Sequence, residues 1–452
     1  MYLINKKISI VGGGLVGSLL SIYLSRQGAK VSIFDKREDL RLDHNCVGRS
    51  INLALSDRGL RALKELKIDA LILKIAMPMY KRIMHSKTAV LTEQPYGKNE
   101  QAIYSVSRRE LNIQLLNIAE ANSVKIFFQK ECSRVDFLQT KLEFSDGCSV
   151  ESDFIFGADG AGSVVRKSMA QRFPEINIME DFIDYSYKEL SIPPNRDGSH
   201  RLENKSLHIW PRKSYMVIAL PNLDGSFTCT LFAPNKGKKS FTSLTNSQLV
   251  DEFFNSEFYD LKNLIPDLAT QYFNNPTSNL GFVRSNSWRE CNTILLGDAC
   301  HATVPFYGQG MNAGFEDCFL LNNWLNQHHS FSNTNFMQFL KHRIIDTMAM
   351  QDLSMSNFIE MRDKTADPQF LLQKQIERWF SDKHPDKWEP LYSMVTFSRL
   401  RYSEAMKKGQ VQNNIMQDIM IDNNLTGSFD IKDLEKKNIE KKILLQLSLL
   451  TL

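Results

Sequence analysis

The stretch IVGGGLVGSLL at residues 10–20 decides the fold. It continues an apolar, β-branched run that predicts a buried strand, and it leads into apolar residues at helical spacing. Gly12 and Gly14 match a turn that lets the backbone approach a pyrophosphate, while Gly17 lets helix and strand pack closely. With a second apolar strand at 31–35, the stretch predicts a βαβ unit that holds a dinucleotide at a helix N-terminus.

Acidic residues follow the predicted strands. Asp35 ends the second strand, where its carboxylate can accept hydrogen bonds from both ribose hydroxyls and would repel a 2′-phosphate. This site is therefore predicted not to hold NADP. Two later strands end in the same way, in FGADGAGSVVR at 156–166 and LLGDACHATVPFYGQGMNAGFEDC at 295–318. Three parallel strands closed by Gly and Asp predict one shared crevice at their carboxyl ends.

The pattern changes between these strands. Segments such as SYMVIALPN and SFTCTLFAP alternate apolar and polar residues, which predicts an inserted antiparallel sheet, and the chain after about residue 311 becomes helical. The expected division is a discontinuous nucleotide-binding domain (1–75, 105–175 and 285–330), an inserted substrate domain (76–104 and 176–284) and a helical region (331–452). We therefore expect an α/β fold with an α+β insertion.

Composition excludes several classes of protein. The net charge is +4, from 55 Lys and Arg against 51 Asp and Glu, which is too small to argue for nucleic-acid binding. The seven cysteines form no C-x-x-C pair and predict reduced thiols of a cytoplasmic protein. No signal peptide is expected, and no run reaches the roughly 20 apolar residues that span a bilayer. We expect the tail at 443–452 to form a helix on its own protein, with a membrane-surface or partner contact left open.

The three Gly-rich stretches, in this order, resemble the flavoprotein aromatic hydroxylases, the para-hydroxybenzoate hydroxylase-like family. The resemblance implies bound FAD, with NADPH as co-substrate although no second Rossmann unit is visible. It also implies hydroxylation of an aromatic ring by dioxygen through a flavin C4a-hydroperoxide. The protein would supply orientation and a dry pocket, while the flavin carries the chemistry.

The resemblance assigns roles to individual residues. Asp298 would bond the ribityl chain, Pro305 would border the flavin ring, and His301 would be either a base near it or, more often, a satisfied structural histidine. Arg109 is not expected to contact the cofactor, and no metal site is predicted. The residues expected to contact FAD are Gly12, Gly14, Leu15, Val16, Gly17, Phe34, Asp35, Lys36, Arg37, Ala54, Arg108, Cys132, Asp159, Gly160, Asp298, Gly310, Met311 and Asn312.

A closer resemblance concerns the substrate. The segments RSINLALSDRG, MPMYKRIMHS, LHIWPR, NFIEMR and YSMVTFSRLRY resemble the members of the family that hydroxylate L-kynurenine in tryptophan degradation and NAD biosynthesis. This implies that Arg82 forks the substrate carboxylate, since guanidinium and carboxylate match geometrically. Tyr96, Asn357 and Tyr402 would supply the other polar contacts, and Lys81 is a poorer candidate. Phe306 and Met361 would border an apolar pocket.

Alternatives remain open at this point. The chain could hydroxylate another aromatic acid, or it could be a non-catalytic FAD-binding redox partner. Eukaryotic relatives carry a C-terminal membrane anchor, and this chain shows no such segment, so a cytoplasmic, bacterial-type enzyme without a transmembrane anchor is expected. A homodimer is possible in this reading.

Overall fold

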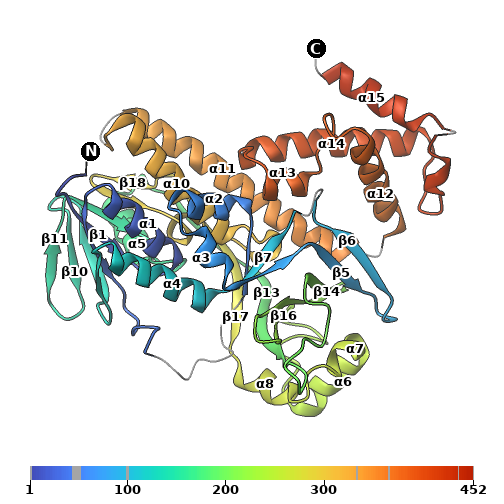
Figure 1. Ribbon diagram of the computed structural model, residues 1–452, viewed down its shortest axis with the longest axis horizontal. Helices are drawn as coiled ribbons and strands as arrows, with labels where there is room; N and C mark the ends of the chain where they lie inside the picture. The colour runs from blue at the N-terminus through green and yellow to red at the C-terminus, as the bar shows by residue number, and fades with distance from the viewer. Residues whose placement is uncertain are drawn as a thin grey trace.

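A six-stranded sheet forms one of the two halves of the fold (Figure 1). The computed structural model describes residues 3–42, 52–97, 101–331, 334–364, 367–435 and 437–450. The strands are β1 (Lys7–Val11), β2 (Lys30–Phe34), β8 (Lys125–Phe127), β12 (Phe154–Gly157), β18 (Arg289–Glu290) and β19 (Thr293–Leu295). Their order is β18-β19-β12-β1-β2-β8, and only the β18–β19 pairing in this sheet is antiparallel.

Helices pack on this sheet because its strands are apolar on both faces. Ile8, Ile10 and Ile33 are buried in one core with Leu19 and Leu20 of α1, and α1 packs against α4 and α10. The helices of this half are α1 (Leu15–Arg26), α2 (Asp57–Glu65), α3 (Asp69–Leu73), α4 (Arg108–Ala121), α5 (Val164–Arg172), α9 (Asp298–His301) and α10 (Gly310–His328). The carboxyl ends of β1, β12 and β19 therefore lie beside helix N-termini.

The structure has two further sheets of three strands each. One has the order β3-β7-β4 and joins the two large sheets; the other, β11-β10-β9, is a meander at the outer edge. Their strands are β3 (Asn52–Leu55), β4 (Ala76–Met79), β7 (Ile103–Ser107), β9 (Cys132–Asp136), β10 (Lys141–Phe144) and β11 (Ser149–Glu151).

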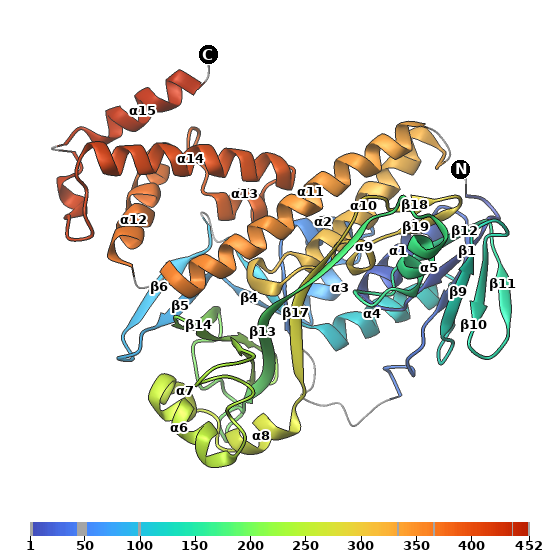
Figure 2. The ribbon, with the colours of Figure 1, turned by 180° about the vertical axis from the view of Figure 1, so that it is seen from behind.

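A seven-stranded sheet forms the inserted half (Figure 2). Its strands are β5 (Lys81–His85), β6 (Leu91–Pro95), β13 (Ile178–Ile192), β14 (Ser206–Arg212), β15 (Tyr215–Pro221), β16 (Phe227–Pro234) and β17 (Thr277–Ser285). Their order is β17-β13-β16-β15-β14-β5-β6, and only β14 and β5 pair in parallel. Side chains alternate between two cores, since Trp210 packs with α6 (Ser247–Glu257), α7 (Tyr259–Lys262) and α8 (Leu268–Asn274), whereas Ile209 packs with Phe306 and Phe358.

Helices make up the last part of the chain and lie on the other side of the inserted sheet from α6–α8 (Figures 1 and 2). They are α11 (Thr334–Ile359), α12 (Pro368–Lys383), α13 (Leu391–Phe397), α14 (Tyr402–Asp422) and α15 (Ile439–Leu450), with the short turns η1 (Pro305–Tyr307), η2 (Glu360–Lys364) and η3 (Ile431–Asp433). Helices α12, α14 and α15 share a separate core. Within the described ranges, no helix combines the length and apolarity needed to cross a membrane.

The structure confirms the predicted fold class. The strands of the six-stranded sheet all come from the three segments expected to bind the nucleotide, and those of the seven-stranded sheet come from the inserted segments apart from the last residue of β17. The tail helix α15 buries Ile439 and Ile443 and exposes Leu445 and Leu449. Residues 443–450 of that predicted tail are thus helical, and residues 451–452 lie outside the described range.

A buried histidine chain lies under the inserted sheet. His208 Nε2 is 2.8 Å from the Glu203 carbonyl oxygen, and its Nδ1 is 2.9 Å from His85 Nε2. Asp260 accepts a hydrogen bond from Trp210 at 2.8 Å and faces His85 Nδ1 at 3.2 Å. Burial lowers the pKa of His208 from 6.5 to about 4, with the bond to Glu203 opposing this shift and His85 adding to it.

We expect this histidine to make the protein less stable in mild acid. The folded chain keeps His208 neutral between pH 6.5 and about 4, whereas the unfolded chain takes up a proton below 6.5. Stability therefore falls as pH drops through this window, by about 2 kcal/mol between pH 7.5 and pH 5. Urea unfolding at the two pH values should show a smaller loss for His208→Gln than for the wild type. Equal losses would contradict this assignment.

Candidate active site

The first glycine turn leaves room for an anion at the start of α1. Gly12 has φ +101°, and a Cβ there would lie 2.5 Å from the Ala158 carbonyl oxygen; a Cβ on Gly17 would lie 2.0 Å from the Gly12 oxygen. A Cβ on Gly14 would meet nothing within 4 Å, and among the residues that the structure describes no side chain caps the N-terminus of α1. Open space beside uncapped N–H groups fits the pyrophosphate of FAD.

Asp35 lies at the end of β2, where a ribose contact was predicted. It is buried, and its carboxylate accepts from the Gly13 N–H at 2.7 Å and from Arg37 through Nε at 3.0 Å and Nη2 at 2.7 Å. Burial acts to raise the pKa of Asp35, but Arg37 and the backbone N–H groups outweigh it and hold the pKa below its usual value. Since the backbone N–H of Arg37 occupies a fourth position on this carboxylate, a ribose hydroxyl would have to displace a bond from the half-exposed Arg37.

The second stretch has a structural function that the sequence did not reveal. Asp159 caps α5, because it accepts from the Ser163 hydroxyl at 2.6 Å and from the Val164 N–H at 2.7 Å. Arg166 is fully buried and donates to the Ala299 carbonyl at 2.7 Å, which ties α5 to α9. A Cβ on Gly160 would meet nothing within 4 Å, so the turn itself stays open.

Other predicted cofactor residues lie around the same half. Burial raises the pKa of the Cys132 thiol to about 12, so this thiol is a neutral packing group at neutral pH. Arg108 is the first residue of α4. Burial raises the pKa of Glu189 on β13, and the positive charge of Arg108 opposes that rise. Phe34 stacks on Phe127 at the end of β2, with ring centroids 5.1 Å apart.

The third glycine-rich stretch, at residues 295–318, is held against β3 through Asn312. Asn312 at the start of α10 donates to the carbonyls of Ala54 at 2.9 Å and Gly308 at 2.8 Å, and it accepts from the Ser56 N–H at 2.9 Å. Within the described ranges, no residue donates a hydrogen bond to the Asp298 side chain, which is therefore available to a ribityl hydroxyl. The N-terminus of α10 also has no side-chain cap, and its positive end can favour negative charge on a flavin pyrimidine.

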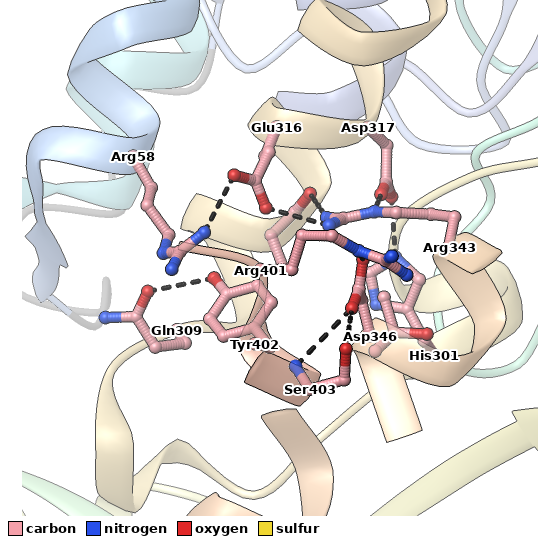
Figure 3. A network of polar contacts seen from close by, with 12 residues as sticks. Arg58, His301, Gln309, Glu316, Asp317, Arg343, Asp346, Arg401, Tyr402 and Ser403 are labelled. Atoms are coloured by element: carbon pink, nitrogen blue, oxygen red, sulfur yellow. Dashed lines mark hydrogen bonds and ion pairs between the residues drawn. The ribbon is translucent and has the colours of Figure 1, made fainter. Parts of the chain in front are cut away.

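His301 lies inside a buried network of charges (Figure 3). Its Nε2 is 2.6 Å from Asp317 Oδ2, and its ring packs near Trp288 with centroids 5.2 Å apart. It is 1% exposed. This geometry favours a structural role for His301 over a role as a catalytic base. Pro305 begins η1, directly before the turn that leads into α10.

The same network was missed from the sequence (Figure 3). Glu316 is 2.9 Å from Arg58 and 2.8 Å from Arg343, and Asp317 is 2.7 Å from Arg343. Burial acts to raise the pKa of both carboxyl groups, but the surrounding cations outweigh it and the pKa values are lowered. Two adjacent acids flanked by the apolar runs AGF and CFLL were a usable signal, because such residues are rarely buried without cations.

On the inserted sheet, Arg82 stands among tyrosines without a carboxylate partner in the described part of the chain. Its guanidinium carbon is 5.2 Å from the Tyr96 ring centroid and 4.6 Å from that of Tyr392, and Tyr307 stacks on Tyr392 at 5.6 Å. The buried Tyr96 hydroxyl has no hydrogen-bond partner among the described residues. A buried donor and an unpaired cation together fit a carboxylate ligand.

The structure places Tyr402, a predicted substrate contact, away from Arg82. Tyr402 is fully buried on α14, where its hydroxyl donates to Gln309 at 3.0 Å and its ring lies under Arg58 at 4.1 Å. Within the described ranges it makes no contact with Arg82; Tyr392, ten positions earlier in the same resembling segment, does. The segment YSMVTFSRLRY contains both tyrosines, and only the turn before α14 separates them in space.

Asn357 and the apolar predictions meet at the other end of this sheet face. Asn357 donates to the Phe306 carbonyl at 2.6 Å, and Phe306 stacks on Phe358 with centroids 4.4 Å apart. A small, partly open hollow adjoins them. It is lined by Tyr185, Lys213, Ser214, Tyr215, Met216, Phe232, Phe306, Phe358, Met361 and Arg362. Phe306 and Met361, the two residues predicted to border the substrate, thus lie on the wall of this hollow.

The fold and the cradle define a class of protein. The model of the FAD binding domain family matches residues 5–330. The fold is similar to 2-methyl-3-hydroxypyridine-5-carboxylic acid oxygenase, with TM-score 0.67 and 21% identity over 80% of this chain and 94% of that one. It is also similar to a probable FAD-dependent monooxygenase from Pseudomonas aeruginosa, with TM-score 0.64 and 15% identity over 79% and 97%. The chain is therefore a FAD-binding flavoprotein with the aromatic hydroxylase fold.

Sequence relatives give the narrower family. The chain is 46% identical to kynurenine 3-monooxygenase of Flavobacterium psychrophilum, over 96% of this chain and 98% of the relative. It is 41% identical to that of Cytophaga hutchinsonii, with the same coverage, and 41% identical to that of Myxococcus xanthus over 91% and 90%. The chain belongs to the kynurenine 3-monooxygenase family.

Proposed function

We propose that this chain hydroxylates L-kynurenine to 3-hydroxy-L-kynurenine. NADPH and a proton supply the reducing equivalents, one oxygen atom of dioxygen enters the ring, and the other leaves as water. The observation that carries the proposal is the Arg82 guanidinium beside the Tyr96 ring, where neither the guanidinium nor the buried Tyr96 hydroxyl has a carboxylate partner among the described residues. A carboxylate bound there would satisfy both groups, which leaves the rest of an amino acid to extend over the apolar sheet face.

The residues of the site orient the substrate. Arg82 pairs with the carboxylate, Tyr96 donates to it, and Tyr392 stacks on Tyr96 with centroids 5.5 Å apart, which limits how the carboxylate end can move. Phe306 and Met361 belong to an apolar cluster beneath the inserted sheet and are proposed to exclude water from the aryl end. Asn357 holds the Phe306 turn through its backbone carbonyl.

Bound FAD would supply the redox chemistry, accepting hydride from NADPH and activating dioxygen. The residues proposed to hold it are the predicted set, with Gly12, Gly14 and Gly17 at the pyrophosphate, Asp298 at the ribityl chain and the start of α10 at the pyrimidine. The amino group of kynurenine activates the neighbouring ring carbon, so no strong base is required. The buried His301, whose Nε2 lies 2.6 Å from Asp317, agrees with such a mechanism.

We further propose that the predicted domain boundaries and the cytoplasmic location hold. The domain proposal is supported by the separate origin of the two large sheets, and the location by the pattern of cysteines. The second tyrosine contact to substrate is proposed to be Tyr392 in place of Tyr402.

We expect the purified yellow protein to oxidise NADPH faster when L-kynurenine is added. Mass spectrometry should find a product that is one oxygen atom heavier, together with matched consumption of dioxygen. Stimulated oxidation that yields only hydrogen peroxide would show that kynurenine is a mimic and that another aromatic acid is the substrate. No stimulation would refute the assignment of kynurenine, and 2-aminobenzoate serves as the control ligand that lacks the amino-acid side chain.

A further inference from the structure

Arg58 is a buried cation that the proposed reaction does not use. It lies on α2 and is 2% exposed. Its Nη1 donates to Glu316 of α10 at 2.9 Å, while its Nε donates to the Val395 carbonyl at 2.5 Å and its Nη2 to the carbonyls of Leu400 and Met394. Figure 3 shows the contact of Arg58 with Glu316. One guanidinium therefore joins the helix that begins at the flavin cradle to the C-terminal end of α13.

The two ends of this connection lie at two parts of the proposed site. Asn312, one turn before Glu316, bonds to Ala54 and Gly308 around the predicted flavin position. Tyr392, near the start of α13, lies against Arg82. The last carbonyls of a helix have no partner within the helix, and a cation there also favours the negative end of its dipole. Arg58 thus caps the end of α13 together with the Ser398 hydroxyl, which donates to the Met394 carbonyl at 2.6 Å.

The bonding pattern requires an arginine. Its planar group presents five N–H donors in fixed directions, so it can bond a carboxylate and several carbonyls together, which a lysine ammonium cannot do from the same position. Arg61, one turn along α2, makes a natural comparison. It is 2.7 Å from the same Glu316 and lies over the Phe319 ring, and within the described ranges it makes no hydrogen bond to α13.

We propose that Arg58 is a positioning residue that holds α13, and through it Tyr392, in the geometry that binds the substrate carboxylate. The proposal rests on the proposed function, because it concerns the same carboxylate. It links occupancy of the substrate site to the helix at the flavin cradle through a single side chain. Lysine at position 58 should keep a positive charge near Glu316 but lose the bonds to the helix end.

The test compares FAD-loaded wild type, Arg58→Lys and Arg61→Lys by titrating flavin absorbance with two ligands. One is L-kynurenine, and the other is 2-aminoacetophenone, which has the aryl ketone but no carboxylate. Arg58→Lys should raise the Kd for kynurenine at least about tenfold and change that for 2-aminoacetophenone less than about twofold. Arg61→Lys should leave both within about twofold.

Several results would overturn the proposal. Equal weakening of both ligands, equal behaviour of the two variants, or loss of FAD from Arg58→Lys alone would show a general role in the fold. A double-mutant cycle with Tyr392→Leu is the second check, since Arg58→Lys should add little once Tyr392 is gone. If wild type hydroxylates kynurenine and Arg58→Lys binds it normally, only this inference fails. If wild type shows no turnover with kynurenine, the proposed function fails instead.

Discussion

Replacing Arg82 by methionine should raise the KM for L-kynurenine about 100-fold or more while FAD stays bound. Removing one partner of a desolvated charge pair costs roughly 2–5 kcal/mol, and each 1.4 kcal/mol is about tenfold in affinity. The arginine lies on β5 in the inserted sheet, and the glycine cradle lies in the other half, so cofactor affinity should not change. Methionine keeps much of the stem that packs between Tyr96 and Tyr392.

Lys81 provides the matched control on the same strand. Strand alternation directs it away from Arg82, and its ammonium pairs with Glu93 at 2.7 Å at the surface. Lys81→Met should therefore change KM less than about twofold, as is usual for an exposed ion pair. Steady-state kinetics and the FAD content of both variants decide the matter. An unchanged KM in Arg82→Met, or similar changes in both variants, would remove the carboxylate assignment.

How much of this site the sequence could predict depends on the range of the interaction. The glycine cradle was predictable, because Gly17 meets neighbours within its own βαβ unit and Gly12 has the positive φ that such a turn requires. The local pairing of Asp35 with Arg37 was not predicted, although the two residues are nearly adjacent. A sequence motif shows that an acid is present at this position. It does not show whether a neighbouring side chain or a ribose hydroxyl bonds to that carboxylate.

Long-range pairings were harder to predict. Tyr392 and Tyr402 occur in one short segment, and either could be matched to a substrate contact by resemblance alone. The bend between α13 and α14 sends one tyrosine to Arg82 and the other to Gln309, and that bend is fixed in part by Arg58 from far away in the chain. Since the sequence does not state which distant cation caps α13, it could not choose between the two tyrosines.

Replacing Arg343 by methionine should destabilise the protein by about 3–5 kcal/mol, because it leaves buried carboxylates short of a cation. Arg343 bonds to Asp317 at 2.7 Å, to Glu316 at 2.8 Å and to the Ala313 carbonyl at 3.0 Å. Glu316 would retain Arg58 and Arg61, but Asp317 would keep only His301 and the Gly297 N–H. Urea unfolding of the FAD-loaded protein, followed by tryptophan fluorescence, measures the loss.

An exposed lysine gives the comparison that isolates burial. Lys383 also contacts two carboxylates, Glu435 at 2.9 Å and Glu440 at 3.0 Å, but all three side chains are at the surface. Lys383→Met should cost less than about 1 kcal/mol, since water solvates the carboxylates that it leaves. If the two variants lost equal free energy of unfolding, the buried ion pairs would contribute no more to stability than exposed ones. A large loss confined to Arg343→Met would instead show that the fixed position of α10, on which the flavin cradle depends, rests on charges held out of water.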